Sequence, residues 1–406
     1  TMSKVIVVGG GPSGMMAALT ASKNGHQVTL IERNDELGKK LKLTGGGRWN
    51  ITNKRYIEEF FDKVVTNEKF LYSAFYSFTN EDLLDFLSES NFEYKVEEHN
   101  DYKVYTNSDK ATELINLFKN LLLDNKINIL YNSKVVDLIV EDNKIEGVVL
   151  EDSTKVYGDK VIISTGGKSH SKTGSDGTMH KILAKHGHNV TTTYPALSPL
   201  KIKEDFTRRL QGISLKGVEI SCKLNKRKKI SKRGDMLFAH FGITGPVVLI
   251  ISSYINKLLE KEPVELTIDC VPDISEEEIR KAIRENPNKN IANNLKHMLP
   301  LNFIKEILDY LNLSETKPNE LTKENENKIV EYIKDMKLTT NSTLGIQVSM
   351  VTSGGVSVKE INSSTMESKL IENLYFTGEV IDVDAETGGY NLQIAFSTGY
   401  LAGISI

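Results

Sequence analysis

Cysteine is scarce in this 406-residue chain: only Cys222 and Cys270 occur, and no C-x-x-C motif is present. A disulfide framework, a cysteine-based zinc site and a redox-active dithiol are therefore not indicated. Long apolar runs are also missing, and none approaches the roughly 18 residues of a membrane-spanning helix. The first predicted strand begins at Lys4, which leaves no room for a signal peptide, so we expect a cytoplasmic protein without a membrane partner.

An excess of either charge is missing as well. The chain has 51 Lys and Arg against 54 Asp and Glu, a formal net charge of −3, and 39% of its residues are hydrophobic. These values are typical of a soluble globular protein, and the length favours two or three domains. The slight acidity argues against bulk binding of nucleic acid, so we expect a small-molecule substrate. No particular oligomeric state is predicted.

The strongest motif lies in the first fifty residues. A predicted apolar strand at residues 4–8 leads into G-x-G-x-x-G and a helical pattern, and a second strand ends in an acid 21 residues after the second motif glycine. This order predicts an adenine-dinucleotide site, with pyrophosphate at the helix N-terminus and the acid on a ribose hydroxyl. A plain glycine-rich turn is the alternative. The predicted cofactor-binding residues are Gly9, Gly11, Pro12, Ser13, Gly14, Glu32 and Arg33.

A second glycine-rich stretch, TGGGRWNITN, occupies residues 44–53. Three consecutive glycines form neither a good helix nor a good strand, but they let backbone N–H groups wrap around a ligand. A flexible loop is the other interpretation. The residues expected to bind the cofactor in and before this stretch are Lys40, Thr44, Gly45, Gly46, Arg48 and Asn50.

Short strands between residues 127 and 156 are typical of a β-meander, and the apolar strand that follows ends in T-G-G. Small residues at the carboxyl end of a strand allow the backbone to approach a cofactor. The expected contacts here are Val135, Thr165, Gly166 and Gly167.

The pattern changes near residue 191. Mainly β-type segments follow, including the apolar run at residues 247–252, and then helices at residues 272–313 and 322–336. We interpret this part as an inserted domain. The predicted division is residues 1–190 and 346–406 for the two parts of a cofactor-binding domain, and 191–345 for the insert, with a helical sub-domain at about 273–336.

The end of the chain adds a strand, a glycine–acid segment and a final helix. FAD is long enough to be contacted by both ends of the chain, whereas no second G-x-G-x-x-G offers a separate NAD(P)H domain. The sequence therefore favours FAD, with NAD(P)H docking transiently as a possible electron donor. A carboxylate such as that of Asp382 suits a ribityl hydroxyl, and the last helix offers free N–H groups to the ring. The expected contacts are Gly378, Glu379, Asp382, Gly389, Tyr390, Asn391 and Leu392.

Six segments in this order resemble the aminoacetone-oxidase-like, BaiN-type family of bacterial FAD proteins over essentially the full length. They are residues 9–14, 44–53, 173–177, 234–246, 352–356 and 377–403. The resemblance implies an α/β fold: a Rossmann-type, two-part FAD-binding domain with an inserted β-barrel and a helical sub-domain. Family members are linked to reduction of dehydro-bile acids and to oxidation of aminoacetone. The family usually has Cys where this chain has Trp49, its only tryptophan.

Three side chains are candidate catalytic groups: His240, Arg48 and Tyr390. Structural roles are the alternatives for each of them. We expect an FAD-dependent oxidoreductase that reduces an unsaturated or carbonyl-containing small molecule with NAD(P)H. The alternatives are an aminoacetone-type amine oxidase that produces hydrogen peroxide and a flavin-containing RNA-binding or redox-sensing protein.

One strongly basic run, KLNKRKKISKR, lies at residues 223–233. As a solvated hairpin tip it needs no function. Alternatively it attracts anions such as nicotinamide dinucleotide phosphates, acidic substrates or RNA. Few aromatic residues lie among these lysines, which weakens the RNA interpretation.

Overall fold

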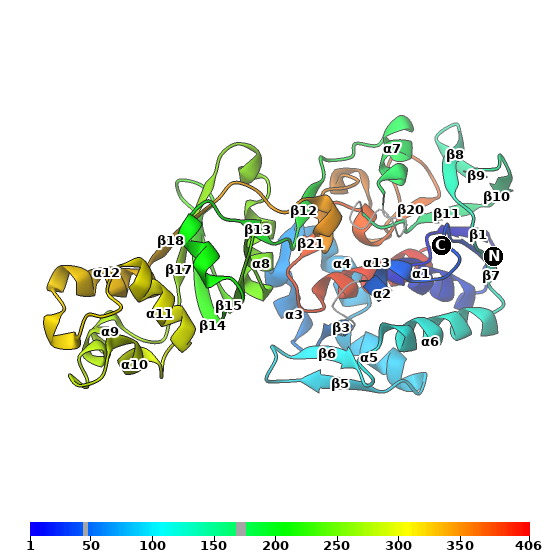
Figure 1. Cartoon of the computed structure of the whole chain (residues 1–406). Coiled ribbons are helices and arrows are strands. Elements are labelled where there is room, and N and C mark those ends of the chain that lie inside the picture. Colours follow the sequence, from blue (N-terminus) through cyan, green and yellow to red (C-terminus); the bar gives the residue numbers. More distant parts are fainter. Residues whose placement is uncertain (44–47, 168–175) are drawn as a thin grey trace. The chain divides into compact units, whose positions relative to one another are not determined.

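The computed structural model describes residues 1–43, 48–167 and 176–406, which divide into two compact units (Figure 1). The first unit comprises Thr1–Tyr194 and Met350–Ile406, and the second comprises Pro195–Ser349. The expected insert was residues 191–345. Among the described residues, no helix combines the length and apolar character needed to cross a membrane.

The first unit is built on a five-stranded parallel sheet. Its strands lie in the order β20 (Leu374–Phe376), β11 (Lys160–Ile163), β1 (Lys4–Val8), β2 (Gln27–Ile31) and β7 (Asn128–Leu130). The central strands are almost continuously apolar and buried, as parallel strands covered on both faces must be. Helix α1 (Pro12–Lys23) connects β1 to β2, and α6 (Ala111–Asp124) precedes β7. The predicted Rossmann-type α/β arrangement is confirmed.

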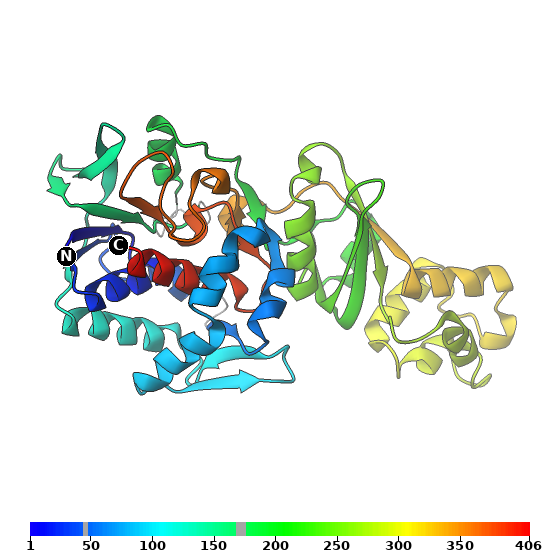
Figure 2. The same ribbon diagram turned by 180° about the vertical axis from the view of Figure 1, so that it is seen from behind.

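The last helix, α13 (Tyr390–Ile404), packs directly on α1, so the two ends of the chain lie side by side (Figure 2). Small residues permit this close contact. A Cβ atom added to Gly399 would lie 2.3 Å from the carbonyl oxygen of Ser13, and one added to Gly403 would lie 2.7 Å from Cβ of Thr20. Larger side chains on this face of α13 would push the helices apart.

The predicted meander is confirmed as an antiparallel sheet of β8 (Val135–Glu141), β9 (Lys144–Leu150) and β10 (Lys155–Tyr157), whereas the first segment of that pattern joins the parallel sheet as β7. A second antiparallel sheet has the order β3 (Asn50–Asn53), β6 (Lys103–Thr106), β5 (Tyr94–Glu97), and β4 (Val64–Thr66) pairs with β21 (Asp384–Ala385). The other elements of this unit are α2 (Lys39–Leu43), α3 (Ile57–Phe60), α4 (Tyr72–Ser77), α5 (Asn80–Glu89), α7 (Thr178–Lys185) and β19 (Val351–Ser353).

The second unit contains a six-stranded sheet and begins with the short strand β12 (Tyr194–Ala196) at the boundary. The sheet order is β13 (Leu200–Lys201), β16 (Gly242–Thr244), β15 (Lys229–Ala239), β14 (Ser214–Lys223), β17 (Val264–Asp269), β18 (Met336–Thr340). The expected closed barrel is not found. Within residues 195–349, β13 and β18 form no common ladder. The seam has an isolated bridge between Leu200 and Thr343 and single backbone hydrogen bonds, such as that from the N–H of Lys203 to the carbonyl oxygen of Thr339 at 2.9 Å. Closure of a barrel requires a continuous ladder between its first and last strands.

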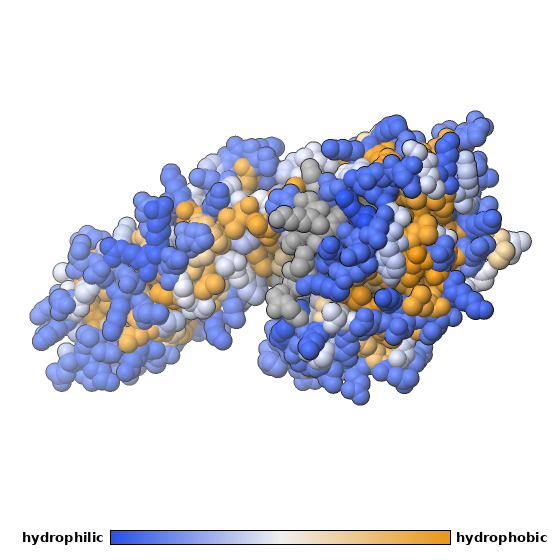
Figure 3. Space-filling model, turned by 45° about the vertical axis from the view of Figure 1, so that its right-hand side comes forward, coloured by the Kyte–Doolittle hydropathy of each residue, from blue (hydrophilic) through white to orange (hydrophobic). Residues whose placement is uncertain are grey.

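Four helices between β17 and β18 form the helical part of this unit: α9 (Glu276–Ile283), α10 (Ile291–Leu295), α11 (Leu301–Tyr310) and α12 (Lys323–Lys334). Their apolar faces share one core with the sheet, because Phe238 of β15 stacks on Phe303 of α11 with ring centroids 6.3 Å apart. The face of this unit seen in Figure 3 is mainly hydrophilic, which is the expected counterpart of that buried core.

The strand predicted at residues 247–252 is wrong: this run lies in helix α8 (Pro246–Ile255). Gly245, with a φ of +103°, precedes the helix, and Pro246 occupies its first turn, a position that proline favours. The helix is apolar on most sides because much of it is buried, so its sequence lacks the polar face that would have revealed a helical period.

Candidate flavin site

The glycine turn after β1 has the geometry that a dinucleotide site requires. Gly9 has a φ of +112°, and a Cβ there would lie 2.3 Å from the carbonyl oxygen of Ser164. A Cβ on Gly14 would lie 1.9 Å from the carbonyl oxygen of Gly9, so α1 can approach the turn only with glycine at this position. Gly11 differs, because a Cβ there would meet no atom within 4 Å. The open space at Gly11, next to Pro12 at the N-terminus of α1, suits an approaching pyrophosphate.

Glu32 is buried beside this turn. Its carboxylate accepts hydrogen bonds from the backbone N–H groups of Gly10 at 3.0 Å and Asn34 at 2.7 Å. Burial raises the pKa of Glu32, although the N–H groups of Asn34 and Gly10 lower it. The N–H of Ser133 donates to the carbonyl oxygen of Glu32 at 3.0 Å, which brings the start of β8, with the buried Val135, to the same place. Arg33 forms an ion pair with Asp176 at 2.8 Å.

Ser13 is linked to the ends of two parallel strands through hydroxyl groups. Thr377, which follows β20, lies 2.6 Å from Ser164 and 2.9 Å from Ser13 (oxygen to oxygen). The next residue, Gly378, has a φ of +67° and packs on Ser13, since a Cβ there would lie 2.8 Å from the Ser13 hydroxyl. The first and last motifs of the chain therefore meet at the carboxyl ends of the sheet strands.

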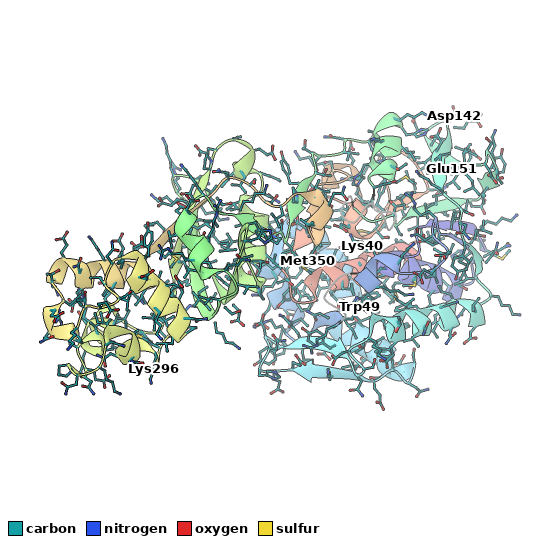
Figure 4. All side chains as sticks on the ribbon, viewed as in Figure 1. Lys40, Trp49, Asp142, Glu151, Lys296 and Met350 are labelled. Atoms are coloured by element: carbon teal, nitrogen blue, oxygen red, sulfur yellow. The ribbon has the colours of Figure 1, made fainter. Side chains whose placement is uncertain are left out.

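Lys40, Gly167 and Glu379 also come together from distant parts of the sequence. The Lys40 ammonium lies 2.8 Å from one carboxylate oxygen of Glu379, and the other oxygen accepts the N–H of Thr352 at 2.5 Å. A Cβ on Gly167 would lie 2.8 Å from the Glu379 carboxyl carbon, so this glycine makes room for the ion pair. Figure 4 labels Lys40 near α1 and α13.

Two buried polar atoms near these segments find no hydrogen-bond partner among the residues that the structure describes. They are the hydroxyl oxygen of Thr165, directly after β11, and the amide oxygen of Asn50, at the start of β3. Buried polar groups are nearly always satisfied, so such atoms fit a site that a polar ligand completes. Together with the open space at Gly11, they show that the residues present fit a bound dinucleotide.

The comparison with known families agrees with a dinucleotide-binding fold. A model of the HI0933-like protein Rossmann domain matches residues 3–405. The chain belongs to the HI0933-like family. It is an FAD-dependent oxidoreductase, and the predicted resemblance to BaiN-type flavoproteins is confirmed.

Three relatives that match over nearly their full length have two different descriptions. The chain is 31% identical to a ribosomal RNA dihydrouridine synthase of Haemophilus influenzae, over 100% of this chain and 98% of the relative. It is 29% identical to a 3-dehydro-bile acid delta(4,6)-reductase of Clostridium scindens, over 99% and 98% of the two chains. A second ribosomal RNA dihydrouridine synthase, from Escherichia coli, is 28% identical over 97% and 96%.

Solved structures of the same fold include a 3-ketosteroid-delta4-(5alpha)-dehydrogenase from Rhodococcus jostii. It matches with a TM-score of 0.54 and 15% identity, over 100% of this chain and 96% of that one. At this identity the likeness concerns the fold alone.

The N-terminus of α13 carries the other group of predicted FAD contacts. Gly389 has a φ of +94°, and a Cβ there would lie 2.4 Å from the carbonyl oxygen of Thr52. The N–H of Gln393 is the first to bond within the helix, so those of Tyr390, Asn391 and Leu392 belong to the turn whose donors have no intrahelical acceptor. The Asn391 side chain accepts the N–H of Ala385 at 2.9 Å and donates to the carbonyl oxygen of Ala385 at 2.8 Å.

Tyr390 is buried, and its ring meets Phe60 edge-on with centroids 5.0 Å apart. Burial raises the pKa of Tyr390, and Asp101 raises it further, whereas Arg55 lowers it. This side chain therefore packs in the interior, and its catalytic role stays a prediction. Asp382 is buried as well, and the amide of Asn67 donates to its backbone oxygen at 2.8 Å.

The predicted site residues in and around the glycine-rich stretch at residues 44–53 have different outcomes. Thr44, Gly45 and Gly46 lie outside the described residues. Arg48 pairs with Glu97 at 2.5 Å and with Asp109 at 3.3 Å, and its guanidinium lies 3.9 Å from the Tyr105 ring centre. Its charge is thus compensated by the β5–β6 region. Trp49, labelled in Figure 4, is buried and donates from Nε1 to the carbonyl oxygen of Leu41 at 3.1 Å. Gly166 follows β11 with a φ of +79°.

His240 belongs to the second unit, whereas the other predicted site residues that the structure describes belong to the first. It is exposed between β15 and β16, where its ring meets Phe241 edge-on with centroids 5.2 Å apart. Its catalytic role stays a prediction.

The sequence analysis missed the role of two motif residues. The Thr52 hydroxyl donates to the Gln393 side chain at 2.7 Å, and the Asn53 amide donates to the carbonyl oxygen of Gly388 at 3.2 Å. These bonds clamp the start of α13 onto β3. Thr52 and Asn53 belong to the motif at residues 44–53 and Gln393 to the motif at residues 377–403, so all three were visible in the sequence. Only folding brings the two motifs together.

Proposed function

We propose that this protein uses FAD to reduce a carbon–carbon double bond conjugated to a carbonyl group, with NAD(P)H as electron donor. The observation that carries the proposal is the shared chemistry of the full-length relatives. A 3-dehydro-bile acid with delta(4,6) double bonds and the uracil ring of uridine both contain such a bond. The amine-oxidase alternative has no counterpart among the full-length relatives reported above.

Uridine in ribosomal RNA is the first substrate candidate, because two of these relatives, at 31% and 28% identity, are described as acting on it. This choice departs from our expectation of a small-molecule substrate. A small cyclic enone is the second candidate, supported by the relative at 29% identity.

The chain's own residues supply binding and electrostatics. A bound FAD would supply the hydride-transfer chemistry between a reduced nicotinamide and the double bond. The N–H groups at the start of α13 would stabilise the negative charge of a reduced ring. Gly11 and the N-terminus of α1 would hold the pyrophosphate, and Glu32 would hold a ribose.

A proton must also reach the substrate carbon next to the carbonyl. Tyr390 is buried and Arg48 is held by two carboxylates, so His240 is the remaining candidate donor among the predicted catalytic groups. We therefore expect His240→Gln to slow substrate reduction while leaving flavin reduction by the nicotinamide unchanged.

The test is an anaerobic two-step experiment on the purified protein. Rapid bleaching of the flavin by NADPH or NADH would support the reductive half, and reoxidation by ribosomal RNA lacking dihydrouridine, with dihydrouridine detected by mass spectrometry, would support the first substrate. Reoxidation by a steroid enone but not by RNA would favour the second. A flavin that neither nicotinamide bleaches, but an amine does, would overturn the proposal.

A further inference from the structure

The β14–β15 hairpin carries charge of one sign. Residues 223–233 include seven Lys and Arg and no acid, and the whole hairpin, residues 214–239, has eight cations against two acids. This net +6 occurs in a chain of net −3. The rest of the protein is therefore distinctly acidic, and this hairpin, whose strands β14 and β15 are labelled in Figure 1, is a local exception.

Little within the second unit neutralises the hairpin tip. Arg233 pairs with Glu219 at 2.8 Å and Asp273 at 2.9 Å. By contrast, the residues from Lys226 to Lys229 are exposed and form no ion pair with any residue that the structure describes. The charge at the tip remains available to an external anion.

The register places like charges opposite each other. Lys223 on β14 pairs directly with Lys229 on β15, an arrangement that disfavours the hairpin unless an anion lies between or beside the two side chains. The turn itself is ordered, because the Asn225 side chain accepts the N–H groups of Arg227 and Lys228, each at 2.8 Å. A local turn of this kind presents the cations from a defined backbone rather than from a loose loop.

We propose that this hairpin, residues 223–233, docks the phosphate backbone of the RNA substrate. The inference rests on the proposed function, since RNA is the polyanion that the relatives' descriptions supply. Four consecutive cations, residues 226–229, lie at the turn, and Lys223, Lys232 and Arg233 flank them on the two strands. This arrangement suits a repeating line of phosphates, and contact with phosphates positions RNA without reading its sequence. Recognition of the target uridine then belongs to the flavin site.

The experiment compares two variants, each without four cations. The first is Lys226→Gln, Arg227→Gln, Lys228→Gln and Lys229→Gln. The matched control is Lys281→Gln, Lys289→Gln, Lys296→Gln and Lys305→Gln, which removes exposed lysines from the helical part of the same unit. Binding of a fragment of ribosomal RNA is measured by fluorescence anisotropy at several salt concentrations, with the FAD-loaded full chain.

The hairpin variant should bind RNA at least about tenfold more weakly at low salt. The slope of log K against log salt concentration should become less negative by about two to four. The control should keep most of the wild-type affinity and slope, and both variants should keep their FAD spectrum and their rate of bleaching by NADPH. Equal affinities and slopes for the hairpin variant and the wild type would overturn the inference. A hairpin variant that loses affinity for NADPH but not for RNA would overturn it in favour of a dinucleotide site.

The outcomes separate this inference from the proposed function. If the wild-type protein makes dihydrouridine in RNA and the hairpin variant binds RNA as tightly as the wild type, the role of the hairpin is refuted and the proposed function is retained. If RNA binds through the hairpin in a salt-dependent way but no dihydrouridine forms, the docking role of the hairpin is retained and uridine is refuted as the substrate. Absence of RNA binding by the wild type at low salt would overturn the inference.

Discussion

The ammonium group of Lys40 lies 2.8 Å from the carboxylate of Glu379, a residue 339 positions later in the chain. Both side chains are about four-fifths buried, with exposed fractions of 22% and 19%, so this ion pair is not an ordinary surface contact. It joins the opening and closing parts of the FAD unit beside Gly167. The bond therefore couples the two sequence segments that make up the first unit.

Replacing Glu379 by Gln should destabilise the protein, because the Lys40 charge remains partly buried without its partner. We expect the free energy of unfolding, measured by urea denaturation, to fall by about 1–3 kcal/mol. The matched control is Glu81→Gln, which breaks the exposed ion pair with Lys54 at 2.6 Å and should cost under about 1 kcal/mol. Equal losses in both variants would contradict the coupling role of Lys40 and Glu379.

Alanine at Gly11 and at Gly14 should have different consequences. Gly11→Ala adds a Cβ that meets no protein atom within 4 Å, so the apoprotein should keep its thermal midpoint while FAD affinity falls by about tenfold or more. Gly14→Ala places a Cβ 1.9 Å from the carbonyl oxygen of Gly9 and should destabilise the fold itself by about 2–3 kcal/mol. Calorimetry and flavin titration separate the two effects. Unchanged FAD affinity in Gly11→Ala would exclude a pyrophosphate at this turn.

Two threonines near the strand ends form a similar contrast. Thr165 has a buried hydroxyl without a partner among the described residues, so Thr165→Val should leave the apoprotein as stable as before and weaken FAD binding by about fivefold. Thr377→Val removes hydroxyl contacts with Ser164 and Ser13 and should cost about 1–3 kcal/mol of stability without FAD. Destabilisation of the apoprotein by Thr165→Val would show that its hydroxyl serves the fold.

Acid should weaken the first unit partly through Asp137. Burial opposes the shift, but hydrogen bonds from Lys185 at 2.7 Å and His186 at 2.8 Å lower the pKa of Asp137 from 3.8 to about 2. A lowered pKa means that the carboxylate stabilises the folded state above pH 3.8 and loses this effect as the pH falls towards 2.

Asp137→Asn should therefore remove about 1–2 kcal/mol of stability at neutral pH and flatten the loss of stability between pH 4 and pH 2. The measurement is chemical denaturation across that range. Asp142→Asn is the control, since it removes an exposed carboxylate from the turn of the same sheet. The same pH profile in wild type and Asp137→Asn would contradict the assignment.

Local chemistry along the chain determined the first half of the site. The order of strand, glycines, helix and acid at residues 4–32 requires only neighbours in sequence, and it predicted the Rossmann turn and the place of Glu32 correctly. Glycine at position 14 has a cause that the motif already contains, since a Cβ there would meet the backbone of Gly9 in the same turn, whereas Gly9 faces the backbone of Ser164, which only the folded sheet brings to this place.

Tertiary structure decided what distant segments do together. No local pattern could show that Thr52 holds Gln393, that Lys40 pairs with Glu379, or that Arg48 is occupied by Glu97. The same holds for helix α8 and for the missing ladder between β13 and β18 in the described part of the second unit. A short apolar run is compatible with a buried helix or a buried strand, and strand patterns do not say whether the first and last strands meet. Burial and long-range pairing are properties of the assembled chain, so they appear only when the chain has folded.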